Sequence, residues 1–169
     1  TPLLKAINLG KLEFVKLLID NGADPYYKSD NEHEIIWFAI HDNHPNNDII
    51  KLLLQFNYDE GLLLASLYKG PNIEVLKKLL QSLKIRDNYN ESESKLLSVE
   101  EVYKDILSTN KDVSNLKYSD QGFAGFRYAI ASDNTYFFYE IKKTAYENTY
   151  RFYKTSSGKY LMEHEYYSF

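Results

Sequence analysis

The chain has 169 residues, a formal net charge of -4 and a pI near 5.6. This acidic balance argues against non-specific binding to nucleic acid or to an anionic membrane, because both need a positive field on the protein. The absence of cysteine excludes a disulfide framework and a zinc-thiolate site, and it favours a cytoplasmic location. No apolar run has the length of a membrane span, and no signal peptide is visible.

The first stretch, residues 1-24, predicts two short helices joined by a tight turn. Thr1 fits an N-cap, and Pro2 fits the first helical position, where its missing N–H is harmless. Gly10 marks the turn and Gly22 the end of the second helix, because glycine adopts positive φ at little cost. The apolar residues recur at helical spacing: Leu3, Ala6, Ile7, Leu12, Val15, Leu18 and Ile19. Helices this short cannot bury their apolar stripes alone, so we expect a stack of similar units.

The same stretch resembles the ankyrin repeat. The residues that carry the resemblance are Thr1, Pro2, Leu3, Ala6, Gly10, Val15, Leu17, Leu18, Gly22, Ala23 and Asp24. Leu4 stands where the repeat pattern has histidine, which removes a usual loop hydrogen bond and leaves the packing unchanged. The chain opens inside this motif without a methionine, so we expect upstream sequence in the native protein. The resemblance implies a rigid helical scaffold that binds another protein.

Two further units of the same kind follow the first. The second begins at Glu34, and its second helix repeats at residues 49-54 the apolar run of residues 14-19. The apolar face of its first helix comprises Ile35, Ile36, Ala39 and Ile40. The third, residues 61-80, keeps both apolar stripes but lacks many of the turn residues of the first unit, as a terminal repeat would. We therefore predict about three repeats in residues 1-83.

The second half of the chain changes its pattern. Residues 84-97 are polar and predict a hydrated connector, and the capping-box spacing of Ser98 and Glu101 predicts a helix that ends at Asn110. Four segments with period-two alternation and short turns then predict an antiparallel meander, at residues 126-131, 136-141, 150-153 and 160-167. The predicted fold class is therefore α+β, with an ankyrin-like repeat stack followed by a helix-plus-meander domain over residues 98-169.

The inner face of the stack is the first candidate site. Ankyrin-like proteins leave open to partners the positions of Lys5 and Asn8, and we assign Phe38 and His41, then Leu64 and Leu67, as their equivalents. Large apolar side chains at such positions imply that another surface covers them, either the C-terminal domain or a separate partner. Tyr and Trp supply contact area at low entropy cost, although Trp37 fits a core position equally well. The predicted partner-binding residues are Tyr26, Tyr27, His33, Trp37, Phe38, His41, Leu64 and Tyr68.

Metal binding is the second candidate. His33, His41, Asp42 and His44 lie close in sequence, and the spacing His41-x-x-His44 can reach one metal ion. The spacing fixes no third ligand, however, and His44 precedes Pro45 in a loop. We interpret these histidines as surface residues and predict no metal site.

The third candidate is a face of the sheet with alternating aromatic and charged residues. Its members are Arg127, Tyr136, Phe138, Glu140, Arg151, Tyr153, Glu163, Glu165 and Tyr167. Glu140 with Glu163 could act as paired carboxylates, or His164 as a general acid or base, but cross-strand ion pairs explain the pattern without catalysis. The aromatic rings lack the basic background and the motifs of an RNA-binding sheet. Without a nucleophile motif, phosphate loop or metal cluster, we predict no catalytic or cofactor-binding residue.

These observations together predict a non-enzymatic protein-protein interaction protein. Its acidic balance favours a partner with a basic surface. An inhibitor, an immunity-type protein and an effector all fit, the first two in the cytoplasm and the last delivered into a host cell. The alternative is that the repeats dock an enzyme or a small-ligand-binding sheet. A deep, closed pocket in residues 120-169 with convergent polar groups would favour this alternative.

Overall fold

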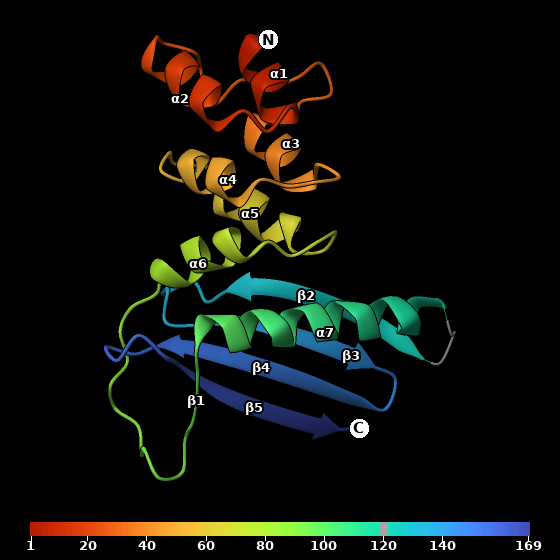
Figure 1. Ribbon diagram of the computed structural model, residues 1–169. Coiled ribbons are helices and arrows are strands. Elements are labelled where there is room, and N and C mark those ends of the chain that lie inside the picture. Colours follow the sequence, from red (N-terminus) through yellow and green to blue (C-terminus); the bar gives the residue numbers. More distant parts are fainter. Residues whose placement is uncertain (119–121) are drawn as a thin grey trace. The chain divides into compact units, whose positions relative to one another are not determined.

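The computed structural model describes residues 1-118 and 122-169. The chain divides into two compact units, residues 1-75 and 76-169. Short helices build the first unit, whereas the second contains an antiparallel sheet and one long helix (Figure 1). The predicted α+β class, with helices at the N-terminal end and strands at the C-terminal end, is confirmed.

The first unit is a stack of helix pairs. Its helices are α1 (Pro2–Asn8), α2 (Leu12–Asp20), α3 (Ile35–His41), α4 (Asn47–Leu53), α5 (Glu60–Ser66) and the start of α6 (Ile73–Gln81). Within this unit, α1, α3 and α5 follow one another on one side, and α2 and α4 lie on the other (Figure 1). Thr1 caps α1 as predicted, because its Oγ1 accepts a hydrogen bond of 3.2 Å from the Leu4 N–H. Gly10 and Gly22 have φ of 65° and 88°, which the two turns require.

The core of the first unit repeats three times along the chain. Three buried positions recur on the inner helices, and α3 adds a fourth, Ile35. The recurring positions are Leu3, Ala6 and Ile7 in α1, Ile36, Ala39 and Ile40 in α3, and Leu63, Ser66 and Leu67 at α5. The outer helices add Val15 from α2 and Ile50 from α4, both fully buried. This repetition is the packing that the helical period of the sequence predicts.

Equivalent positions on the two outer helices differ in exposure. Phe14 and Leu17 on α2 are 61% and 56% exposed, whereas Ile49, which aligns with Phe14, is 1% exposed on α4. The difference arises because α4 packs against both α2 and α3, so that the first repeat covers this face of the second. The apolar pattern of one repeat therefore does not by itself determine which of its side chains are buried.

The second unit contains a five-stranded antiparallel sheet. Its strands are β1 (Lys95–Leu97), β2 (Phe123–Ile130), β3 (Phe137–Lys143), β4 (Tyr146–Lys154) and β5 (Tyr160–Ser168), in the spatial order β1-β5-β4-β3-β2. The meander β2-β3-β4-β5 is the predicted one, but the sheet has one strand more than the four expected. The additional strand, β1, lies in the segment 84-97 that we expected to be a connector. Three residues are too short a run to show a period of two.

Helix α7 (Val99–Tyr118) lies across one face of this sheet (Figure 1). The predicted capping box is present, because Ser98 Oγ accepts from the Glu101 N–H and Glu101 Oε1 accepts from the Ser98 N–H, each at 3.2 Å. The predicted end at Asn110 is wrong. Val113 continues the buried stripe, and the Asn110 side chain instead accepts a hydrogen bond of 2.6 Å from the Tyr128 hydroxyl.

Aromatic side chains fill the layer between α7 and the sheet. Phe137, Tyr139 and Phe152 are buried, and their ring centroids lie 6.0–6.1 Å apart in the pairs Phe137–Phe152 and Tyr139–Phe152. The Tyr139 hydroxyl donates to Asp105 Oδ2 on α7 at 2.6 Å. Burial and then this hydrogen bond raise the pKa of Tyr139. The opposite face of the sheet, here called the open face, carries the charged residues.

Candidate protein-binding surface

Four ring-bearing residues form a cluster at α3, here called the α3 aromatic cluster: His33, Trp37, Phe38 and His41. The imidazole of His33 stacks on Trp37 with centroids 4.1 Å apart and planes 6° apart. Phe38 meets Trp37 edge-on at 5.4 Å, and His41 lies 4.6 Å from the same indole. All four side chains are half-buried. Because each ring contacts another, the four side chains have little conformational freedom left to lose.

The local fold explains how His33 joins this cluster. Residues 25-34 form a finger closed by backbone hydrogen bonds from Ser29 N–H to His33 C=O at 2.9 Å and from Ile35 N–H to Tyr27 C=O at 3.1 Å. This places His33 just ahead of Glu34, the N-cap of α3, and four residues before Trp37, which is itself four residues before His41. Trp37 and His41 meet on one face of α3 because they are four residues apart in the helix, and the finger backbone brings His33 against the same indole. This four-residue spacing was visible in the sequence and could have predicted that the His33 ring stacks on Trp37.

The two predicted finger tyrosines do not belong to the cluster. The Tyr26 ring packs against Phe56 and Tyr58 at centroid distances of 6.1 and 5.6 Å, and its hydroxyl accepts from the Asn57 N–H at 3.3 Å. Burial, followed by the nearby Glu34 carboxylate, raises the pKa of Tyr58. Tyr26 therefore ties the finger to the end of the second repeat, and Tyr27 is half-buried in the finger backbone turn.

The predicted alignment of the third repeat is shifted by one residue. Leu67, which we expected at an open position, is 0% exposed. The burial pattern instead aligns Tyr68, 42% exposed, with Asn8 and His41. Leu64 is half-buried and aligns with Trp37. The sequence alone gave the wrong alignment for the third repeat. Its buried small residue is Ser66, whereas the first two repeats have alanine at this position.

The first unit carries the acidic charge of the chain. Residues 1-75 contain six lysines, no arginine and eleven aspartates and glutamates, a formal net charge of -5. Within the cluster, burial, followed by the charges of Lys69 and His33, lowers the pKa of His41 below 6.5. At neutral pH the cluster is therefore an aromatic surface with an uncharged His41, on a unit whose net charge is negative.

The lowered pKa of His41 makes a testable prediction about acid stability. A folded-state pKa below the unfolded-state value gives stability that is complete above pH 6.5 and is lost as the pH falls through the folded-state pKa. We expect His41→Gln to lose less stability than the wild type between pH 7.5 and pH 5, as measured by urea denaturation. An equal loss in both proteins would contradict the assignment to His41.

The histidines do not form a common metal site. His33 and His41 contact Trp37, whereas His44 lies in an exposed loop, where its N–H donates to Asp42 Oδ1 at 3.0 Å. Among residues 1-118 and 122-169, no group of three or more His, Cys, Asp or Glu residues is placed to hold a metal ion.

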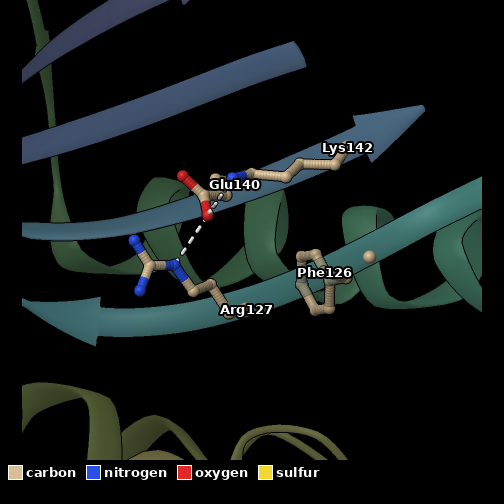
Figure 2. Close-up of a pocket in the computed structure, with 5 residues that line it drawn as sticks. Phe126, Arg127, Glu140 and Lys142 are labelled. Carbon is tan, nitrogen blue, oxygen red and sulfur yellow. Dashed lines mark hydrogen bonds and ion pairs between the residues drawn. The ribbon is translucent and has the colours of Figure 1, made fainter. Parts of the chain in front are cut away.

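The open face of the sheet carries the predicted cross-strand ion pairs. Arg127 Nε lies 2.7 Å from Glu140 Oε1, and Lys142 Nζ lies 3.5 Å from the same oxygen (Figure 2). Arg86 pairs with Glu163 at 3.1 Å. Arg151 pairs with Glu165. Glu140 therefore pairs with two cations and Glu163 with a third, and the two glutamates do not form a carboxylate pair.

Two hollows adjoin this face. One, of about 390 Å³, lies between β2 and β3 and is lined by Gly125, Phe126, Arg127, Glu140 and Lys142 (Figure 2). The other, of about 450 Å³, is lined by Lys84, Ile85, Arg86, Asp87, Asn88, Thr135, Tyr136 and Tyr153. Both are open to solvent, unlike the deep, closed pocket that would favour an enzyme. His164 stacks on Tyr150 at 4.2 Å and hydrogen-bonds to Asn148 Oδ1.

Comparison with known families identifies the N-terminal segment. Residues 1-30 match the ankyrin repeat family, as the motif residues predicted. No curated protein and no solved structure matched the chain. In the described part of the chain, no helix is long and apolar enough to span a membrane. Ankyrin repeats are typically non-enzymatic interaction modules, so the match supports a protein-interaction scaffold.

Proposed function

We propose that the protein binds another protein through the α3 aromatic cluster, together with Leu64 and Tyr68. The observation that carries the proposal is the set of mutually stacked, half-exposed rings on a helical repeat scaffold. Aromatic residues in such positions dominate the energy of many protein interfaces. Tyr26 and Tyr27 extend the proposed surface along the finger.

The partner has a basic surface in this proposal. The support is the net charge of -5 on residues 1-75, which steers a cationic protein towards this unit and disfavours nucleic acid. A non-enzymatic inhibitor, an immunity-type protein or an effector would all use this kind of surface. The first two act in the cytoplasm, and an effector acts in the host cell that receives it.

Substitution of Phe38 tests the proposal. Phe38→Glu places a charge among the cluster rings, and we expect at least about tenfold weaker capture of the partner from a lysate of the source organism. Phe14→Glu is the control, because Phe14 is an exposed phenylalanine of the same unit outside the cluster. Circular dichroism establishes whether each variant is folded, and Tyr68→Ala removes an exposed ring if Phe38→Glu unfolds.

Salt dependence tests the charge of the partner separately. We expect the captured protein to have a high pI and to be released as ionic strength rises, because salt screens charge attraction. Capture of the same protein by wild type, Phe38→Glu and Tyr68→Ala alike would contradict the proposed surface. Capture that is insensitive to salt would contradict a basic partner.

A further inference from the structure

Strand β5 has an outer edge that β1 covers only in part. The pairing runs from Leu97 opposite Tyr160 to Lys95 opposite Met162 and stops there. Beyond Met162, β5 continues to Ser168 with β4 on its other side, and no strand of the described chain pairs with its outer edge. We call residues 163-168 the free β5 edge. An uncovered edge presents N–H and C=O groups that can pair with another strand.

The chain's own upstream residues turn away from this edge. If β1 continued in its register, Glu93 would lie opposite His164 and Glu91 opposite Tyr166. Residues 91-93 instead form a turn. The local sequence therefore leaves the edge for a different strand.

The two edges of the sheet differ in how they are protected. The β2 edge has a register shift between Phe123 and Gly125, the kind of irregularity that blunts an edge. The β5 edge pairs with β4 in unbroken register and contains neither lysine nor proline. Tyr166 and Tyr167 on it are 57% and 51% exposed. It is thus a smooth edge with exposed aromatic side chains, suited to strand addition.

We propose that a second copy of the chain pairs antiparallel with this edge, about a two-fold axis at Tyr166. Tyr166 then lies opposite Tyr166 of the second copy, and Glu165 lies opposite Tyr167. This pair is chemically matched, because the Tyr167 hydroxyl already donates to Glu165 Oε1 at 2.6 Å within one chain. Centring the axis one residue earlier puts Glu165 opposite itself, which like-charge repulsion disfavours. The result is one continuous sheet across two chains.

The absence of cysteine allows a direct test of this register. In the full chain, Tyr166→Cys places two thiols on directly opposite residues, within disulfide reach. Ser168→Cys is the control, since its two thiols would be four residues apart, about 13 Å along the strand. We expect mild oxidation to give at least about tenfold more covalent dimer with Tyr166→Cys than with Ser168→Cys.

Sedimentation of the unmodified protein provides a second test. We expect the mass to rise from 19.8 kDa towards twice that value with increasing concentration. Tyr166→Glu should suppress the rise by placing two carboxylates opposite each other, whereas Ala145→Glu, in an exposed turn, should not. Equal cross-linking of the two cysteine variants overturns the proposal. If the chain remains monomeric at every concentration, the proposal is also overturned. This holds even if a foreign peptide binds to the free β5 edge.

Discussion

Replacing Ile49 with alanine is expected to destabilise the first unit by about 2–5 kcal/mol, whereas alanine at Phe14 should cost less than about 1 kcal/mol. The two residues occupy the same position in successive repeats. Ile49 is 1% exposed, and its truncation leaves a cavity between α4 and its neighbours. Phe14 is 61% exposed, so most of its ring is already in water and little burial is lost.

The single tryptophan makes this prediction measurable. Trp37 lies in the first unit, so its fluorescence during urea denaturation reports the unfolding of the repeats. We expect the midpoint of Ile49→Ala to fall well below that of the wild type, and the midpoint of Phe14→Ala to remain close to it. If both substitutions had the same effect, the alignment of the repeats or the packing of α4 would be wrong.

The helical pattern predicted the repeats but not their burial. Spacing identified the stripes that contain Val15 and Ile50, because any covered helix needs an apolar face. It could not distinguish Phe14 from Ile49, because their exposure depends on which neighbour lies above them. In the third repeat, a serine in place of the expected alanine shifted the alignment, so that Leu67 was predicted open and is buried.

The candidate surface was predictable in part. Phe38 and His41 were selected as exposed helix positions, and Trp37 as an aromatic anchor that fits a core position equally well. The structure brings these three together with the predicted His33. Tyr26 was placed in the same group because a tyrosine in the finger supplies contact area at low entropy cost. Its contacts with Phe56 and Tyr58 depend on how the finger folds over the second repeat, which spacing does not reveal.

In the sheet, the period of two determined the faces correctly. It put Arg127 and Glu140 on the same face, and the two residues lie directly opposite each other in the register. It missed β1, since three residues show no alternation. The end of α7 was misplaced because Asn110 looked like a helix stop, whereas its side chain bonds to Tyr128 in the core.

The strongest prediction for the second unit concerns the two faces of the sheet. Phe152 is 0% exposed and packs against Phe137 and Tyr139 in the layer beneath α7. Its replacement by alanine should cost about 3–5 kcal/mol, because the cavity is enclosed by other rings. Phe138 lies on the open face, where it is half-buried beneath the Arg127 guanidinium at 5.2 Å. Phe138→Ala should cost only about 1–2 kcal/mol, for lost partial burial and one cation–π contact.

Near-UV circular dichroism distinguishes these outcomes, because the tyrosine rings of the second unit are fixed by its packing. Trp37 fluorescence, recorded in the same urea series, shows whether the first unit is affected as well. We expect Phe152→Ala to lower strongly the urea midpoint of the tyrosine signal, and Phe138→Ala to lower this midpoint slightly. A larger effect of Phe138→Ala would mean that the open face is the true core of the second unit. The ion pairs of Arg127 and Arg151 would then be structural groups buried by a cover, not groups on a solvated face.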